Sequence, residues 1–432
     1  MGMKIRLLVF PAIISCAFPL LARADDWPQW RGPDRTDISK ETGLLKSWTS
    51  GGPNLLWTYS DAGIGYSGPS IVGDRLFTMG DRGNSEYVFA LDTNTGKQIW
   101  STPIGQVFHN GYGDGPRATP TVDGDVLYAL GAQGKLICAE TATGKKRWQV
   151  DTYKDLQGQM MSGWGYSESP LVDGDRVVCT PGGSLGTLAA LDKKTGKVIW
   201  RSTELTDTAS YSSCIVAEAG GIRQYVVMTG EAVAGVAADD GRLLWHYVQP
   251  PGKYRVAVVA TPIFHNNSVY VSADYNAGCD LIKLSPNGQR MKAEKVYANK
   301  NMENHHGGVI LVGEYLFGCS GNTNQKTRWA CQEFRTGRNA WEESRKLEGG
   351  SLTCADGLLY CYTQHEGTVV LLEPSPEGWK EHGRFTIPRQ TTQRSPRGGI
   401  WTHPVVANGK LYLRDQELIF CYDVKDHQRS GQ

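Results

Sequence analysis

Short blocks of apolar and β-branched residues recur along most of the chain, separated by polar residues and glycine. The block from Asp125 to Leu130, which reads Asp-Val-Leu-Tyr-Ala-Leu, is an example. Blocks of this kind, bounded by turn residues, predict buried β-strands. Asp-Gly pairs stand between the first two blocks and supply the positive φ that a tight hairpin needs. The pattern therefore predicts an all-β protein built from antiparallel hairpins.

Four such blocks make one repeat, which recurs about every 46 residues. Residues 67–100, 118–148 and 168–200 align by eye, and each copy ends with a Thr-Gly-Lys turn and a tryptophan. The third and fourth blocks are joined by turns such as Asp92 to Lys97, where Asx and glycine chemistry closes the loop. Self-similarity at this period is typical of a β-propeller or a solenoid.

The two ends of the repeat array are out of step with each other. Residues 55–59 read as a fourth strand without predecessors, whereas residues 401–424 supply three strands and stop before a fourth. A ring in which the N-terminal strand completes the C-terminal blade resolves this mismatch and removes the open sheet edges. We therefore predict an eight-bladed β-propeller of four-stranded antiparallel blades. The residues expected to pack between its blades are Trp57, Trp100, Trp148, Trp200, Trp245, Trp341 and Trp379, with Val296-Tyr297 replacing the eighth tryptophan.

The first 24 residues have the pattern of a secretory signal peptide, with Lys4 and Arg6, an apolar stretch over residues 7–21 and an Ala-Arg-Ala cleavage site. The apolar stretch is shorter than the roughly 20 residues of a membrane-spanning helix, and no other segment is apolar enough to span a membrane. We expect an exported protein, periplasmic or extracellular, with a lipoprotein anchored through Cys16 as the alternative. The predicted order is a signal peptide (1–24), an N-terminal extension (25–54), the propeller (55–424) and a polar tail (425–432).

The charges of the chain are balanced, with 45 lysines and arginines against 44 acidic residues. Removing the signal peptide leaves 42 basic and 44 acidic residues. This balance gives no electrostatic reason to expect nucleic acid or an anionic membrane surface as a partner. We expect a monomer.

Nine cysteines remain after cleavage at Ala24, and their spacing is not that of a disulfide framework. Cys138 and Cys421 occupy positions that alanine fills in other repeats, which favours compact core residues. Two pairs are candidate cross-strand neighbours, and the sequence leaves open whether they bond: Cys319 with Cys331, and Cys354 with Cys361.

The string Ala-x-Asp-x-x-Thr-Gly-x-x-x-Trp at residues 90–100 and 190–200 resembles the tryptophan-docking repeat of pyrroloquinoline quinone (PQQ) propellers. The opening Asp-Trp-Pro-Gln-Trp-Arg-Gly-Pro at residues 26–33 is similar to that of exported bacterial PQQ-like repeat proteins. The resemblance covers residues 55–424 and implies the propeller fold. It does not imply one function, because quinoprotein alcohol dehydrogenases hold PQQ and calcium in such a ring, whereas the propeller lipoprotein of the outer-membrane assembly machinery binds protein.

In a propeller the chain crosses from the outer strand of one blade to the inner strand of the next, so residues just before each first strand face the central channel. These positions hold polar, aromatic and cationic residues, which suit a small ligand with carboxylates. Alternatively, these side chains bind water at the channel mouth and form hydrogen bonds with the backbone groups of the loops. The candidate ligand-binding residues are Tyr66, Arg117, Tyr166, Glu168, Tyr211, Arg255, His305, His306, Trp401 and His403.

A quinoprotein needs a carboxylate base near a calcium ion and a tryptophan stacked on the quinone. Glu168, Glu303, Asn304 and Trp401 are of suitable types, but the chain lacks the adjacent Cys-Cys pair of the alcohol dehydrogenases and a matching aspartate-base motif. We therefore predict no cofactor, with PQQ and calcium as the alternative. No metal site is predicted either, because the adjacent histidines His305 and His306 would point to opposite faces of a strand.

Three long loops are candidates for recognition: residues 106–117, 153–166 and 388–401. The last holds Arg389, Arg394 and Arg397, which form either a docking patch or a solvated rim. Since no complete catalytic set is present, we predict a non-enzymatic binding or scaffold module for a protein, peptide or glycan. The alternatives are a PQQ- and calcium-dependent oxidoreductase of alcohols or sugars, tested first at Glu168 and Arg117, and another carbohydrate-active enzyme.

Overall fold

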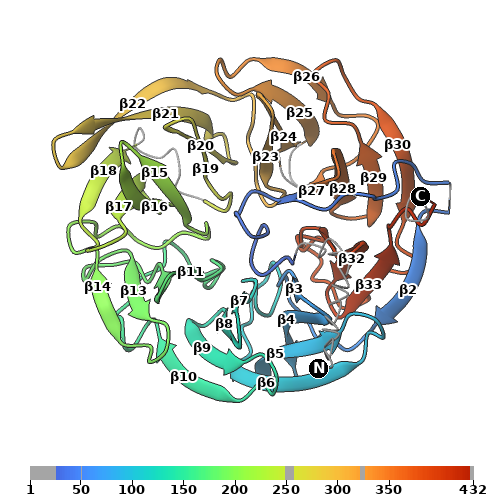
Figure 1. The fold of residues 1–432 in the computed structure, drawn as a ribbon, viewed down its shortest axis with the longest axis horizontal. Helices are drawn as coiled ribbons and strands as arrows, with labels where there is room; N and C mark the ends of the chain where they lie inside the picture. The colour runs from blue at the N-terminus through green and yellow to red at the C-terminus, as the bar shows by residue number, and fades with distance from the viewer. Residues whose placement is uncertain (1–25, 50, 249–256, 322–325, 429–432) are drawn as a thin grey trace, which may run out of the picture.

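Eight four-stranded antiparallel sheets surround a central axis (Figure 1). The computed structural model describes residues 26–49, 51–248, 257–321 and 326–428, and within these ranges it contains strands and turns but no helix. In each blade the first strand lies nearest the axis and the fourth lies at the rim (Figure 1). The predicted eight-bladed β-propeller is confirmed.

The first four blades follow one another along the chain. Their strands are β3 (Ser70–Val72), β4 (Arg75–Arg82), β5 (Ser85–Asp92) and β6 (Gln98–Gln106); β7 (Thr121–Asp123), β8 (Val126–Leu130), β9 (Lys135–Glu140) and β10 (Lys146–Asp151); β11 (Leu171–Asp173), β12 (Arg176–Cys179), β13 (Ala189–Asp192) and β14 (Val198–Arg201); and β15 (Ile215–Ala219), β16 (Ile222–Met228), β17 (Ala232–Ala237) and β18 (Leu243–Val248).

The next three blades continue the same order. Their strands are β19 (Ile263–His265), β20 (Ser268–Ala273), β21 (Gly278–Asn287) and β22 (Arg290–Asn299); β23 (Val309–Val312), β24 (Tyr315–Ser320), β25 (Arg328–Glu333) and β26 (Asn339–Glu343); and β27 (Gly350–Ala355), β28 (Leu358–Thr363), β29 (Thr368–Leu372) and β30 (Glu381–Thr386).

The eighth blade joins the two ends of the chain. It contains β31 (Val405–Ala407), β32 (Lys410–Asp415) and β33 (Leu418–Asp423) from the C-terminal end and β2 (Asn54–Tyr59) from the N-terminal end. In the pairing of β2 with β33, Trp57 lies opposite Cys421 and Asn54 lies opposite Asp423. The predicted closure of the ring by the N-terminal strand is therefore confirmed.

Tryptophans of the outer strands dock into the third turn of the following blade. The indole N–H of Trp57 donates to the carbonyl of Thr93 at 2.9 Å, and a Cβ placed on Gly96 would lie 2.8 Å from its ring. Gly96 also has φ near +69°, so glycine satisfies both the backbone and the close approach. The same contact pairs Trp100 with Thr141 and Gly144, and Trp148 with Lys193 and Gly196.

The docking varies in the remaining blades. Trp200 lies on Gly241, Tyr297 takes the tryptophan position and donates to the carbonyl of Phe334, and Trp341 donates to the carbonyl of Ser375. Two tryptophans depart from the expectation. Trp245 bonds Gln224 of its own blade at 2.6 Å. Trp379 lies in the turn before β30 rather than on the strand, and it packs edge-on against Trp341 of the preceding blade.

Replacing Gly96 with alanine is expected to destabilise the protein more than the same change at Gly73. Both glycines have positive φ, so both variants carry a similar backbone cost of roughly 1 kcal/mol. Only at Gly96 does the new methyl group meet a tryptophan ring, which adds about 1 to 3 kcal/mol of overpacking. Urea unfolding of the two variants measures the difference, and equal losses would show that the docking contact contributes nothing.

The N-terminal extension enters the centre of the ring, as the blue segment in Figure 1 shows. Trp27 forms a bridge with Ile71 of β3, and β1 (Ile38–Ser39) adds a parallel fifth strand to the inner edge of β27. Between these two points the chain crosses from blade one to blade seven through the channel. No structural role of this extension was predicted from the sequence.

The cysteines of the described residues are core residues rather than disulfide partners. All nine from Cys138 to Cys421 are buried and free. In the strand registers Cys331 lies opposite Phe317, and Cys361 lies opposite Leu352, so neither proposed pair is directly apposed. The prediction that cysteine fills compact core positions is confirmed.

The proposed signal peptide and its Cys16 alternative lie outside the described residues. In the part of the chain that the structure describes, no helix is long and apolar enough to cross a membrane.

Candidate functional site

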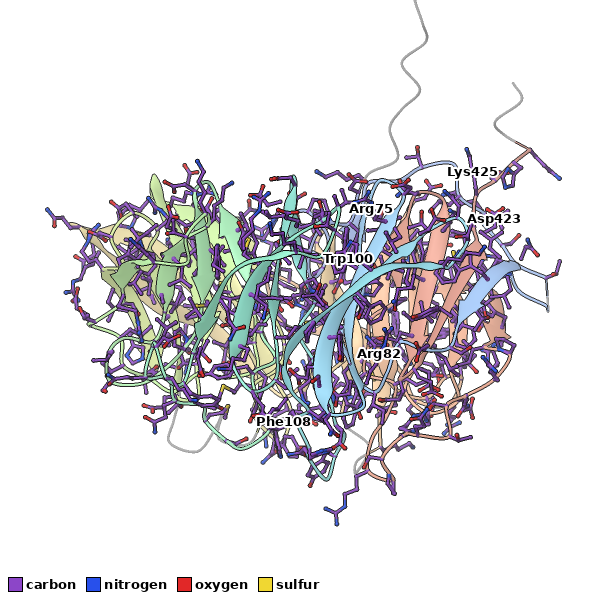
Figure 2. All side chains as sticks on the ribbon, turned by 90° about the horizontal axis from the view of Figure 1, so that it is seen from below. Arg75, Arg82, Trp100, Phe108, Asp423 and Lys425 are labelled. Carbon is purple, nitrogen blue, oxygen red and sulfur yellow. The ribbon has the colours of Figure 1, made fainter. Side chains whose placement is uncertain are left out.

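A cavity with a volume of about 140 Å³ lies at the centre of the ring. Figure 2 shows Arg75, Asp423 and Lys425 on one face of the ring and Phe108 on the opposite face. The loops that reach the cavity belong to the face with Phe108, and they contribute Asn110, Tyr112, Trp164 and Arg397. Seven of the ten predicted residues line this cavity: Tyr66, Arg117, Tyr211, His305, His306, Trp401 and His403. Whether they bind a ligand stays a prediction.

Trp30 and Arg31 of the N-terminal extension also line the cavity, on the side away from the loops. The indole N–H of Trp30 donates to Thr261 Oγ1 at 2.9 Å. The Arg31 guanidinium lies 2.8 Å from Asp37 and donates to the carbonyl of Val309 at 2.5 Å. These contacts reach blades five and six, so the extension forms a floor that makes the channel a blind pocket.

Arg35 anchors the floor from below. Its guanidinium donates to the carbonyls of Cys214 at 2.8 Å, Ser169 at 3.1 Å and Pro170 at 2.6 Å. Its side chain is buried, and burial lowers the pKa of both Arg31 and Arg35. The cost of burying these cations is offset by charge-assisted hydrogen bonds to backbone carbonyls of several blades.

The three predicted histidines have structural partners. His403 Nδ1 lies 3.2 Å from Asp37, and its Nε2 lies 2.8 Å from the carbonyl oxygen of His306. The ring of His306 is stacked on Trp401 with 4.3 Å between centroids. Burial lowers the pKa of His305 to about 4 and holds that of His306 well below its usual value, so both rings are neutral at neutral pH. Among the described residues no group of three His, Cys, Asp or Glu side chains could hold a metal ion.

The wall combines aromatic rings with arginines. Tyr66 lies 5.0 Å from Trp401, and Trp164 lies 5.7 Å from both Tyr112 and Tyr211, measured between ring centroids. These pairs form a nearly continuous aromatic surface, since such distances are typical of interacting rings.

Two arginines stand on this aromatic surface. The Arg117 guanidinium lies 4.7 Å from the ring of Phe108 and 5.8 Å from that of Tyr66, and it donates to the carbonyls of Gly113 and Gly115. Arg397 lies 5.7 Å from the ring of Tyr112. Burial lowers the pKa of Arg117.

Three predicted residues are placed elsewhere. Tyr166 is buried and donates to the carbonyl of Pro181 at 2.8 Å, and Glu168 is buried and accepts the N–H of Thr180. Side chains alternate along extended backbone, so Ser167 and Ser169 line the cavity while Tyr166 and Glu168 point between blades. The expectation that these two face the channel is therefore wrong. Arg255 lies outside the described residues.

The three long loops supply site residues that the rule of first-strand positions missed. Tyr112, Trp164 and Arg397 come from residues 106–117, 153–166 and 388–401. Ser395 donates to the carbonyl of Gly111 at 2.9 Å, so two of these loops are in contact.

The three arginines of the last loop do not form one patch. Arg394 is paired with the buried Asp415 at 2.7 Å and anchors the loop. Arg389 contacts Ser60. Only Arg397 lines the cavity.

The donor set does not fit a calcium ion with PQQ. Calcium takes six to eight oxygen ligands that include carboxylates, yet none of the described residues that line the cavity is Asp or Glu. Asn304 is buried and uses its amide on Gly308 and the carbonyl of Cys319. Trp401, the candidate stacking residue, already carries His306 on one face.

Comparison with known proteins gives relatives of several functions. Residues 84–343 match the model of a family described as outer membrane protein assembly factor BamB. The BamB of Moranella endobia is 24% identical over 68% of this chain and 73% of its own length. The serine/threonine-protein kinase AfsK of Streptomyces griseus is 31% identical over 37% of this chain, but the match spans only 19% of the kinase. The first curated relatives are thus matched over less than half of their length.

Solved structures of other proteins have the same propeller fold as this chain. A quinohemoprotein alcohol dehydrogenase from Comamonas testosteroni aligns with a TM-score of 0.63 and 13% identity, over 93% of this chain and 80% of its own. BamB from Moraxella catarrhalis aligns with a TM-score of 0.59 and 14% identity, over 86% of this chain and 99% of its own. At these identities the likeness shows the fold alone.

Proposed function

The chain belongs to the PQQ-like repeat family described as outer membrane protein assembly factor BamB, and from this membership we propose that it is an exported, non-enzymatic binding propeller for a protein, peptide or glycan. The resemblance to PQQ-like propellers is thereby confirmed. The observation that carries the proposal is the blind central cavity, whose described lining combines aromatic rings with arginines and contains no carboxylate.

Several features of the cavity suit ligand binding. Most of its wall residues stand just before the inner strands of paired sheets, which form a rigid scaffold, and the long loops add the remainder. Aromatic residues and arginine are the side chains that contribute most to recognition surfaces. The segment from Trp27 to Asp37 closes one end, so a ligand enters from the face with the long loops.

The alternative is a PQQ- and calcium-dependent oxidoreductase of alcohols or sugars, since relatives include quinohemoprotein alcohol dehydrogenases. Such an enzyme requires a carboxylate base beside the metal at the substrate. Glu168, the first residue suggested for that role, is buried between blades and bonds the backbone of Thr180. This placement favours the binding function.

Export to the periplasm or the cell exterior is part of the proposal. It is supported by the signal-peptide pattern of residues 1–24 and by the family's description as an assembly factor of outer membrane proteins. A monomer is expected, because closure through β2 and β33 pairs the strand at each end of the array.

The test is a binding screen combined with a quinone assay on purified residues 25–432. We expect a glycan or peptide to bind with one-to-one stoichiometry by calorimetry. Ser167→Trp fills the cavity and should abolish that binding, whereas Ser184→Trp on an exposed loop should not. Stoichiometric uptake of PQQ with calcium, followed by dye reduction with an alcohol or aldose, would overturn the proposal.

A further inference from the structure

Of the three arginines that line the cavity, Arg31 pairs with Asp37, whereas Arg117 and Arg397 have no acidic partner among the described residues. In residues 26–49, 51–248, 257–321 and 326–428, no carboxylate forms an ion pair with Arg117 or Arg397. Three acids act on Arg117: Asp81 and Glu86, whose pKa burial raises to about 7 and about 8, and Asp114, which pairs with His109 at 2.8 Å. Positive charge therefore faces the cavity without full compensation, which favours an anionic ligand.

The shape of the cavity limits the ligand to the end of a chain or to a single unit. A volume of about 140 Å³ corresponds to on the order of ten water molecules, close to the heavy-atom count of one sugar ring. Because Trp30 and Arg31 close the far side, a linear polymer cannot pass through the ring. Only a terminal unit can reach Arg117.

The lining chemistry favours a sugar over a peptide. The rings of Tyr66, Trp164 and Tyr211 offer flat apolar faces, which suit the C–H faces of a pyranose ring. Peptides are instead commonly captured by an open sheet edge or by a nest of free backbone N–H groups. The inner edge of β27 is occupied by β1, and the backbone groups at Arg117 are carbonyls, from Gly113 and Gly115.

Hydroxyl and amide groups complete the lining. Ser167, Ser169, Ser213, Thr261 and Asn110 stand around the aromatic surface and can bond sugar hydroxyls. A planar guanidinium binds a carboxylate through two parallel hydrogen bonds. The cavity thus has one feature for each part of an acidic sugar.

We propose that the central cavity binds the terminal, carboxylate-bearing residue of an acidic glycan, with the sugar ring on the aromatic surface and the carboxylate at Arg117 and Arg397. This inference rests on the proposed function, because it names the ligand class of the same site. The loop residues Tyr112 and Trp164 flank the second sugar unit at the cavity mouth.

Calorimetry on residues 25–432 tests the proposal with four probes: a glucuronate-terminated disaccharide, its glucose-terminated counterpart, the corresponding glucose 6-sulfate disaccharide and a glutamate-terminated tripeptide. We expect the uronate probe to bind at least about 30-fold more tightly than the glucose probe at low salt. Raising the salt concentration should reduce that preference, because the distinguishing interaction is electrostatic.

Two variants separate the arginines from the rest of the wall. Arg397→Gln should weaken uronate binding by about tenfold and weaken binding of the glucose-terminated disaccharide by much less. Arg389→Gln in the same loop is the matched control, since Arg389 is exposed, contacts Ser60 and does not line the cavity. Arg117→Lys retains the charge but not the bidentate geometry. Its loss of uronate affinity should lie between those of Arg389→Gln and Arg397→Gln.

Other binding results would contradict either the ligand class or the proposed function. Equal affinity for glucose and glucuronate termini, or tighter binding of the sulfate or the tripeptide, would overturn the acidic-sugar assignment and leave the binding function standing. Quinone uptake with substrate turnover would overturn the proposed function itself. Uronate binding that survives Ser167→Trp would place the ligand outside this cavity and overturn the inference.

Discussion

Replacing Arg35 with methionine is expected to lower the free energy of unfolding by about 3 to 5 kcal/mol. Arg35 is 4% exposed and donates to three backbone carbonyls on blades three and four. Methionine keeps much of the volume but donates no hydrogen bond, so those carbonyls would remain buried without this donor. Each unsatisfied buried polar group costs about 1 to 3 kcal/mol.

The same substitution also removes the positive charge that faces Glu168. Arg35 acts to lower the pKa of Glu168, against the larger opposing effect of burial. Without it the carboxyl group would hold its proton more firmly, and the cavity floor would lose its anchor below Arg31. The expected loss of stability therefore comes from two places, the cavity floor formed by the N-terminal extension and the channel wall near Glu168.

Urea unfolding at pH 7 measures the loss, with Lys40→Met as the matched control. Lys40 lies in the same N-terminal extension and pairs with Asp34 at 3.1 Å, but both side chains are more than half exposed, at 58% and 61%. Exposed pairs of this kind contribute at most about 1 kcal/mol. A loss at Arg35 no larger than at Lys40 would show that the extension is not a structural part of the ring.

The blades could be predicted from sequence because their signals are local. Turns such as Asp92 to Lys97 and the docking of Trp57 on Gly96 depend on residues within one repeat or its neighbour. The register of the whole ring then follows from repetition. The blade that lacks this tryptophan follows the same pattern. There Tyr297 takes its place, and the tyrosine hydroxyl donates to the carbonyl of Phe334 in the turn of the next blade.

The floor of the cavity could not be predicted in this way. Residues 26–37 have no strand periodicity, and Arg31 bonds a carbonyl 278 positions away along the chain. Contacts of this range depend on the completed ring and not on a local pattern. The sequence did contain one indication that this extension is ordered. Arg31 and Arg35 lie near two tryptophans and several turn residues, and the extension has no run of charges.

The wall of the cavity was predictable in part. The rule that residues before each first strand face the channel correctly places Tyr66, Tyr211 and Trp401. It fails at Tyr166 and Glu168, because adjacent residues of an extended segment face opposite sides and the rule does not say which side is inward. The long loops were recognised as candidates, but sequence alone does not determine which of their side chains turn toward the axis.

Three buried carboxyl groups contribute stability that is present at mildly acidic pH and is lost as the pH rises. Burial raises the pKa of Asp81 to about 7, that of Glu86 to about 8 and that of Glu168 to about 7. In the unfolded chain these groups lose their protons near pH 4 to 4.5. Between that pH and the folded pKa the folded state retains protons that the unfolded state has lost, so stability falls as the pH rises.

Replacing Glu86 with glutamine should remove much of this dependence. Glu86 accepts the N–H of Ala132 at 3.0 Å, and a glutamine oxygen preserves that bond without the ionisable group. Removing Glu86 also removes the charge that it would exert on Asp81. The variant should match the native protein at pH 5 and exceed it at pH 8.5 by on the order of 4 kcal/mol, as measured by urea unfolding at both pH values.

Glu314→Gln is the control for this experiment, because Glu314 is exposed in the turn between β23 and β24 and should leave the pH profile unchanged. The expected order at pH 8.5 is Glu86→Gln most stable, with the native protein and Glu314→Gln together below it. If the difference in stability between Glu86→Gln and the native protein did not grow from pH 5 to pH 8.5, the Glu86 carboxyl group would be ionised and paired in the folded protein. Arg117 would then be neutralised from behind, and the argument for an anionic ligand at that arginine would fail with it.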